Sequence, residues 1–305
     1  MSQGRLRLQD HLLYAGVAGF LGGIGRLPLG VSRPLGAQLG PLVMALNARD
    51  RRRSRSHLRI AFPDLEEAAV RDLLRRNARH VGMLLAEVAW LLQATAEELA
   101  GLCTITGVEH IERALAAGTG AVLITGHCGN WEILNARLGV AGIPLTIAVR
   151  SLSDPRLDRI ITTLRSRYGS EVVPRGQDAG RRLAAALAAN RVNGLLIDQD
   201  IKDIPGVFVP FFGRPAWTPS GAAALALRRG CPLLPTFDHR LPDGRHQVEV
   251  QPPLPDPPPG APEERVIALT AAATAAIERQ IRAYPEQWTW MHRRWRRQPP
   301  NPAAG

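Results

Sequence analysis

The sequence predicts an α/β fold in which a mixed, largely parallel central sheet is flanked by helices. After residue 102, short apolar runs of strand length alternate with longer stretches of helical periodicity. The runs expected to form strands are residues 103–105, 121–125, 145–149, 171–173 and 194–198, and later 232–237 and 247–250. The stretches expected to form helices are residues 108–117, 131–140, 155–168 and 179–190. Such alternation is typical of parallel strands joined by helical crossovers.

The segments around this alternation are predicted to be mainly helical. Residues 66–92 carry apolar side chains at core-facing helical intervals, and residues 266–281 form the last long helix. Residues 208–213 (FVPFFG) are expected to be an apolar loop, and residues 218–221 (TPSG) are expected to begin a helix. The proline-rich residues 252–262 are expected to be an unstructured connector.

Composition limits the class of protein. The 305 residues include 45% hydrophobic ones, enough for one large domain or two small ones with a real core. The formal net charge of +11 favours an anionic partner: nucleic acid, an anionic membrane surface or a phosphorylated substrate. Because the basic residues form no aromatic-interleaved motif and no zinc-finger spacing is present, we expect no nucleic acid partner. The three cysteines have the spacing of neither a metal site nor a disulfide scaffold, which favours a reducing compartment and predicts no metal.

Both ends of the chain have features of a membrane surface. Residues 11–25 and 34–48 are uncharged and glycine-rich, but shorter than the ~20 apolar residues of a spanning helix. The dense basic run 49–59 (RDRRRSRSHLR) follows them. We expect a segment that lies in one leaflet beside headgroup-binding arginines, with a buried core helix and a solvated helix face as the alternatives. In residues 285–297, tryptophans mixed with arginines suit either a membrane interface or a tail packed on the core.

A candidate catalytic histidine lies between a strand and a helix. The turn Gly126-His127-Cys128-Gly129-Asn130 follows the apolar run 121–125, and Asn130 is well placed to cap the next helix. Glu132, in the first helical turn, can bend back toward His127. A carboxylate on one imidazole nitrogen fixes the tautomer, and the other nitrogen can then take a proton from a hydroxyl. The alternative is that His127 merely caps the helix while Glu132 complements its dipole.

Further polar residues follow other strands of the predicted sheet. Because ligands of parallel sheets collect at the carboxyl ends of strands, we expect Arg150 and Asp198 to lie near His127. Arginines here can bind a phosphate or stabilise an oxyanion. Asp198 and Asp200 form a D-x-D pair at the end of the strand 194–198. This pair can hold a divalent cation, bind substrate hydroxyls or form an ion pair with Arg150 or Arg165, and the ion pair with an arginine is favoured. The candidate substrate-binding residues are Asn130, Arg150, Arg165, Arg167, Asp198, Gln199 and Asp200.

Five parts of the sequence together carry a family resemblance. In chain order they are RRRSRSHLRIAFPD, TGHCGNWE, VRSLSDPRLD with LRSRYG, LLIDQD with PFFG, and PEQWTWMHRRW, spread from about residue 49 to residue 297. This succession resembles the bacterial lipid A biosynthesis lauroyl/myristoyl acyltransferase family, within the wider lysophospholipid acyltransferase group. One departure is Cys128, where many relatives have an aromatic or aliphatic residue.

The resemblance implies an acyltransferase with a glycerolipid acyltransferase-like α/β fold. The donor would be an acyl thioester of acyl carrier protein or coenzyme A, and no cofactor or metal would be needed. The acceptor would be a hydroxyl of a membrane glycolipid or lysolipid, of the kind of a lipid A precursor. His127 would be the general base with Glu132 as its partner. Arg150, Arg165 and Asp198 stand at positions where the family also has functional residues.

The resemblance also implies an organisation and a location. Residues 1–48 would be a membrane-associated helical segment, 49–297 the acyltransferase domain and 298–305 a disordered tail. The protein would bind the cytoplasmic face of the plasma (inner) membrane as a peripheral or monotopic protein. A thioester hydrolase differs only in using water as the acceptor. A non-catalytic lipid-binding protein would share the basic and tryptophan-rich ends but would not need the histidine motif.

Overall fold

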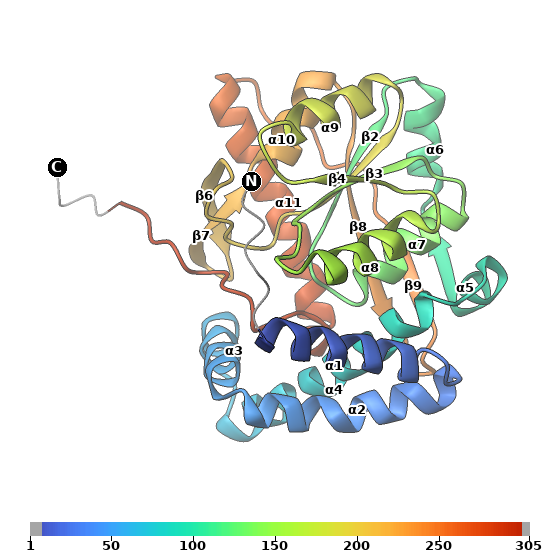
Figure 1. Cartoon of the computed structure of the whole chain (residues 1–305). Coiled ribbons are helices and arrows are strands. Elements are labelled where there is room, and N and C mark those ends of the chain that lie inside the picture. The colour runs from blue at the N-terminus through green and yellow to red at the C-terminus, as the bar shows by residue number, and fades with distance from the viewer. Residues whose placement is uncertain (1–7, 301–305) are drawn as a thin grey trace.

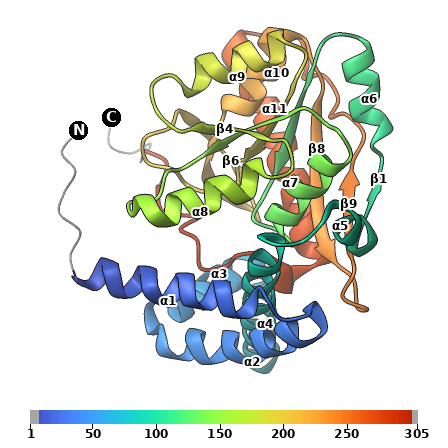
Figure 2. The same cartoon turned by 45° about the vertical axis from the view of Figure 1, so that its right-hand side comes forward.

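The computed structural model describes residues 8–300, and Figure 1 shows an α/β body above a layer of N-terminal helices. The N-terminal helices are α1 (Leu8–Ile24), α2 (Leu29–Leu46), α3 (Ala48–Ala61) and α4 (Glu67–Leu91). The helices of the body are α5 (Ala96–Leu102), α6 (Glu109–Ala116), α7 (Trp131–Val140), α8 (Pro155–Ser166), α9 (Ala179–Ala188), α10 (Gly221–Arg229) and α11 (Pro262–Ala283). A short 3-10 helix, η1 (Pro285–Gln287), precedes the C-terminal tail. Figure 2 shows the same two-part arrangement from another side.

The body is built on a seven-stranded sheet in the order β1-β9-β8-β2-β5-β3-β4. All neighbouring strands are parallel except β8 and β9. The strands are β1 (Cys103–Thr106), β2 (Ala121–Thr125), β3 (Leu145–Val149), β4 (Glu171–Pro174), β5 (Val192–Leu196), β8 (Leu233–Arg240) and β9 (His246–Val250). The predicted largely parallel α/β architecture is therefore confirmed. In a parallel sheet the carboxyl ends of β2, β3 and β5 meet at one edge, which brings the residues after them together.

The central strand β2 is buried on both faces. Its side chains alternate between two hydrophobic cores: Val122 and Ile124 belong to one, and Ala121 and Leu123 to the other. This explains why the strand reads as a continuous apolar run rather than an alternating one. The carboxyl end of β2, from which the turn with His127 follows, is consequently packed against a hydrophobic core on each face of the sheet.

The N-terminal uncharged runs form helices, as expected. Helix α2 packs against α4 at a close approach, because a Cβ on Gly36, Gly40 or Gly82 would collide with the backbone of the opposite helix. These three glycines are thus explained by helix packing. Among residues 8–300 no helix is both long and apolar enough to cross a membrane.

Two sequence-based expectations are corrected by the structure. Residues 208–213 are not a loop: β6 (Gly206–Phe211) pairs antiparallel with β7 (Arg214–Pro219). Phe212 and Gly213, with φ of 50° and 71°, form the two-residue turn between them. The membrane-interface interpretation is wrong for Trp288 and Trp290, which are fully buried in the core. These two indoles pack edge to face, with ring centroids 4.7 Å apart, and fix the C-terminal tail on the body.

A buried ionic cluster joins the helical layer to the sheet. Glu87 of α4, with no exposed side-chain surface, accepts hydrogen bonds from Arg240 at 2.6 and 2.7 Å and from Arg33 of α2 at 2.8 Å. His246 lies between Glu87 and Asp238, at 3.2 and 2.9 Å. Although burial lowers the pKa of His246, these two carboxylates outweigh burial and raise that pKa to about 9. The cluster is therefore a set of paired charges, and Glu87 is its centre.

Replacing Glu87 by glutamine is expected to lower the free energy of unfolding by about 3–5 kcal/mol, because it leaves buried cations without their partner. Urea denaturation followed by circular dichroism measures this. Glu67→Gln is the matched control on the same helix, since Glu67 pairs with half-exposed arginines at the surface and its loss is expected to change the free energy of unfolding little. Equal effects of the two substitutions would contradict the assigned role of Glu87.

Candidate active site

His127 and Asp198 form a hydrogen-bonded pair at the carboxyl edge of the sheet. Thr125 of β2 is paired in register with Leu196 of β5, and the two functional residues each follow two positions later. Asp198 Oδ1 accepts from His127 Nδ1 at 2.7 Å, and Asp198 Oδ2 accepts from the His127 backbone N–H at 2.7 Å. The indole N–H of Trp288, from the C-terminal tail, donates to the same Oδ2 at 2.8 Å. Strand register and the tail together fix the geometry of this pair.

The environment keeps Asp198 ionised. Its side chain is 1% exposed, and burial alone would raise its pKa. The charge of His127 and the hydrogen bonds from His127 and Trp288 outweigh burial and hold the pKa of Asp198 well below its usual range. A carboxylate on Nδ1 keeps the proton on that nitrogen, so Nε2 of His127 is left to act as a base.

A cavity of about 460 Å³ extends from this pair into the body. It has the size of a ligand site, and most of its wall is apolar. The apolar lining includes Leu123, Leu134, Leu145, Ile147, Val149, Leu152, Ile161 and Leu196. The polar lining consists of His127, Glu132, Asn135, Arg150, Arg165, Arg175, Gln199 and His292 together with two threonines. The arrangement suits a ligand with a long apolar part whose reactive end meets a histidine base.

Glu132 lies in this cavity but does not orient His127. Its carboxylate accepts from Arg165 of α8, at 2.6 Å from Nη2 and 3.1 Å from Nε, and from the indole of Trp131 at 3.0 Å. The expected contact between Glu132 and His127 is therefore replaced by the contact with Asp198. The expected ion pair of Asp198 with Arg150 or Arg165 is likewise not formed. The reason is geometric: the first turn of α7 directs Glu132 toward α8, whereas strand β5 delivers Asp198 to the imidazole.

The other candidate residues divide into two groups. Arg150 and Gln199 line the cavity, and the Gln199 amide nitrogen lies 3.1 Å from His127 Nε2. Arg167, Asp200 and Asn130 lie outside its lining. Arg167 donates to the carbonyl of Ala94, and Asp200 accepts from the backbone N–H of Arg297. Asn130 caps α7 by accepting from the N–H groups of residues 132 and 133, as expected, and its amide binds Glu87.

Sequence reasoning missed several residues that complete the site. Trp131 and His292 each contact the His127 ring, with ring centroids 4.7 Å apart. Burial lowers the pKa of His292 to about 4, so this ring is neutral at physiological pH. Both residues stood in stretches already singled out, but nothing in the spacing connected them with His127. In the part of the chain that the structure describes, no group of three or more histidine, cysteine or carboxylate side chains is arranged so that it could hold a metal ion.

The α/β fold presents a histidine–carboxylate pair beside a largely apolar cavity, as an enzyme would, and comparison with known proteins specifies the class. The family model for bacterial lipid A biosynthesis acyltransferases matches residues 2–297. The lipid A biosynthesis lauroyltransferase of Escherichia coli (strain K12) is 28% identical over 276 residues, which cover 90% of this chain and 88% of that protein. The phosphatidylinositol mannoside acyltransferase of Mycobacterium tuberculosis (strain H37Rv) is 34% identical over 197 residues, 63% of this chain and 59% of that protein.

A third relative, the lipid A biosynthesis palmitoleoyltransferase of Escherichia coli (strain K12), is 23% identical over 278 residues. These residues cover 90% of this chain and 88% of that protein. The protein is thus an acyltransferase. It belongs to the bacterial lipid A biosynthesis acyltransferase family.

Proposed function

We propose that this protein transfers a fatty acyl chain from an acyl thioester, carried by acyl carrier protein or coenzyme A, to a hydroxyl of a membrane glycolipid or lysolipid. A lipid A precursor-like acceptor is favoured, because lipid A biosynthesis is named for several relatives that cover most of the chain. The observation that carries the proposal is the His127–Asp198 pair, whose imidazole lines a largely apolar cavity. In this proposal the cavity accommodates the acyl chain, and the thioester carbonyl lies beside the base.

In the proposed mechanism His127 is the general base. Nε2 takes the proton of the acceptor hydroxyl while its oxygen attacks the thioester carbonyl, and Asp198 stabilises the imidazolium that forms. The resulting oxyanion is stabilised by arginines that line the cavity, Arg150 and Arg165. Collapse of the tetrahedral intermediate breaks the carbon–sulfur bond, and the departing thiolate takes the proton from the imidazolium. No metal or other cofactor takes part.

Glu132 is proposed to act through Arg165 rather than through His127. Arg165 Nη2 donates to Glu132 Oε1 at 2.6 Å and Nε donates to Oε2 at 3.1 Å, and the Glu132 side chain is 7% exposed. A bidentate pair of this kind fixes both the position and the orientation of an arginine. This proposal explains why His127 and Glu132 occur in one short motif: His127 is the base, and Glu132 positions Arg165 in the same cavity.

We propose that the helical layer binds the cytoplasmic face of the inner membrane. One stripe of α2 exposes six large apolar side chains at helical spacing: Val31, Leu35, Leu39, Leu42, Val43 and Leu46. The next helix, α3, carries the basic run 49–59, several of whose arginines are exposed. An apolar stripe beside exposed cations fits an anionic membrane surface. Lipid acceptors would reach the cavity from this surface.

The variant Leu42→Glu/Leu46→Glu is expected to bind anionic phospholipid vesicles at least about tenfold more weakly, since burial of each leucine contributes about 1.5–3 kcal/mol. Both side chains are more than half exposed, at 57% and 81%, so the fold should not change. Vesicle cosedimentation measures the effect. Ile267→Glu, at a 42% exposed position of α11, is the control. A double variant that binds vesicles like the wild type would rule out α2 as the membrane surface.

The proposed activity is tested by mass spectrometry of lipids after incubation of the purified protein with acyl carrier protein or coenzyme A thioesters and membrane lipid extract. A new acylated lipid, formed by the wild type and not without enzyme, supports the transferase and identifies its acceptor. Release of free fatty acid with no acylated lipid would instead indicate a thioester hydrolase. Failure of the folded protein to consume any thioester would contradict the proposal.

A further inference from the structure

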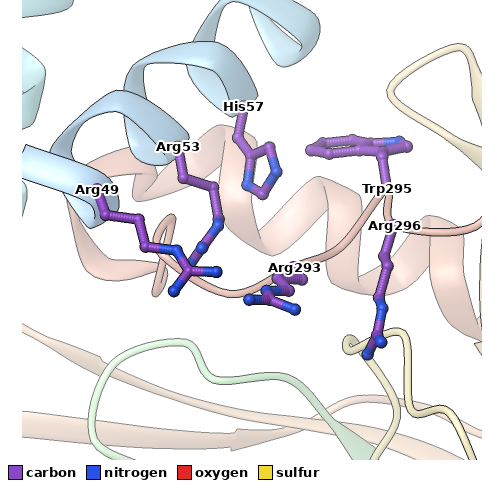
Figure 3. A pocket seen from close by; sticks show the side chains of 6 residues that line it. All are labelled: Arg49, Arg53, His57, Arg293, Trp295 and Arg296. Atoms are coloured by element: carbon purple, nitrogen blue, oxygen red, sulfur yellow. The ribbon is translucent and has the colours of Figure 1, made fainter.

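A second pocket, of about 390 Å³, lies between α3 and the C-terminal tail (Figure 3). We call it the arginine pocket; its lining is Arg49, Arg53, His57, Arg293, Trp295 and Arg296. Figure 3 shows the side chains of Arg49 and Arg53 extending from α3 toward that of Arg293 on the tail. Segments more than 200 positions apart in the sequence thus bring four guanidinium groups around one hollow.

The charge of the arginine pocket is largely uncompensated. Arg53 is paired with Asp50 at 2.9 Å and also donates to the carbonyl of Met291 at 2.9 Å. Within residues 8–300, the other three arginines have neither an ion-pair nor a hydrogen-bond partner, and all three are exposed. Converging like charges repel one another, so an anion bound among them relieves an unfavourable interaction as well as adding favourable ones.

The two aromatic residues define the back of the arginine pocket. His57 is buried, and its Nδ1 donates to the carbonyl of Trp290 at 2.9 Å. Burial lowers the pKa of His57 to about 4, so it adds no charge at physiological pH. Trp295 packs edge to face on His57, with ring centroids 5.0 Å apart. The pocket consequently has a neutral aromatic wall and a rim of mostly exposed arginines, which suits a compact anionic group.

The tail places the arginine pocket next to the active-site cavity. His292 lines the cavity and contacts the His127 ring, and the following residue, Arg293, lines the arginine pocket. A ligand that occupied both sites would have its anionic group at the arginines and its reactive group at His127. Both substrates of the proposed reaction fit this description, because the phosphopantetheine arm of the donor and the headgroups of phospholipids and phosphorylated glycolipids carry phosphate.

We infer that the arginine pocket binds a phosphate group of one of the two substrates of acyl transfer, an inference that rests on the proposed function. Guanidinium groups match phosphate oxygens with paired hydrogen bonds, which makes arginine the preferred residue for such recognition. The bound phosphate anchors the substrate while its thioester or hydroxyl reaches His127. The pocket thereby acts on substrate affinity and not on the chemical step.

The test uses direct binding, so that its result does not depend on turnover. The variant Arg293→Gln/Arg296→Gln removes two exposed guanidinium groups, and Arg49→Gln removes one from the opposite wall. The matched control, Arg228→Gln/Arg279→Gln, removes two exposed arginines from α10 and α11, outside the pocket. Coenzyme A is titrated by calorimetry, and phosphatidylcholine vesicles with and without phosphatidic acid are used in cosedimentation.

We expect the pocket variants to weaken binding of one probe about tenfold or more, because a charge-assisted hydrogen bond usually contributes at least that much to affinity. The control variant is expected to bind both probes nearly as well as the wild type. Weaker binding of coenzyme A alone assigns the pocket to the donor, and weaker binding of phosphatidic acid vesicles alone assigns it to the lipid. Unchanged binding of both probes, or an equal loss in the control, would overturn the inference. Absence of acyl transfer by the wild type would contradict the proposed function without altering these binding results.

Discussion

Replacement of His127 by alanine is expected to lower kcat/KM for acyl transfer by about 10³- to 10⁴-fold, with the protein still folded. His127 lines the apolar cavity and takes the acceptor proton through Nε2 in the proposed mechanism, and a positioned general base contributes about 10²- to 10⁴-fold. In the proposed mechanism its loss also removes the proton donor for the departing thiolate, which places the effect at the upper end. Acylated lipid formed per unit time, measured by mass spectrometry, gives the rate, and thermal denaturation shows that folding is retained.

The matched control is His292→Gln. This substitution removes an imidazole from the same cavity wall, 4.7 Å from the His127 ring, without touching Asp198. Because His292 is neutral and has no part in the proposed proton transfers, its loss is expected to cost less than about tenfold. A His127→Ala enzyme with turnover near that of the wild type would exclude His127 as the base. An equal loss in both variants would mean that the packing of the two rings, rather than one nitrogen, matters.

The sequence was sufficient to predict the sheet and the position of the histidine because the signals there are local. The continuous apolar run 121–125 requires burial on both faces, and the structure provides a core on each side. The capping of α7 by Asn130 was likewise readable, since the residue type and its distance from the helix start are sufficient. The helices 66–92 and 266–281 were predicted to within a few residues for the same reason.

The partner of His127 could not be read from local spacing. Glu132 is five residues away and Asp198 is 71 residues away, and a sequence motif favours the nearer carboxylate. Which one reaches the imidazole depends on the order of strands in the sheet, where β5 is the direct neighbour of β2. Strand order is a tertiary property. The sequence did indicate that Asp198 ends a buried strand. Combined with knowledge of which strand lies next to β2, this signal would have identified Asp198 as the partner of His127.

The C-terminal tail shows the same dependence on tertiary contacts. Its tryptophans and arginines have the composition of a membrane interface, yet Trp288 and Trp290 are buried and Arg294 donates to the carbonyl of Trp217 inside the body. The backbone N–H of Thr289 donates to the carbonyl of His127, so the tail also supports the catalytic turn. Composition is compatible with both a membrane interface and a tail packed on the core, and only the fold distinguishes these two environments.

Substitution of Asp198 by asparagine is expected to lower kcat by about 10³- to 10⁴-fold while KM changes little. Both Asp198 oxygens accept hydrogen bonds from N–H groups, and an asparagine has only one accepting oxygen. If its oxygen faces the His127 backbone N–H and Trp288, its amide nitrogen donates to Nδ1 and moves the imidazole proton to Nε2, which then cannot act as a base. In the other orientation, the amide nitrogen opposes two buried donors and the site is destabilised. Acyl transfer rates at saturating substrate measure the loss.

The substitution Glu132→Gln distinguishes the role of Glu132 from that of Asp198. Glutamine keeps an oxygen for Arg165, so the arginine loses part of its anchoring but His127 keeps its partner and its tautomer. We expect a loss of about ten- to a hundredfold, smaller than that of Asp198→Asn. The reverse order of effects, with Asp198→Asn near wild-type activity and Glu132→Gln inactive, would show that Glu132 orients the base during turnover. Since both side chains are buried, and one holds the imidazole of His127 while the other holds the guanidinium of Arg165, the comparison distinguishes a partner of the base from a support for the oxyanion.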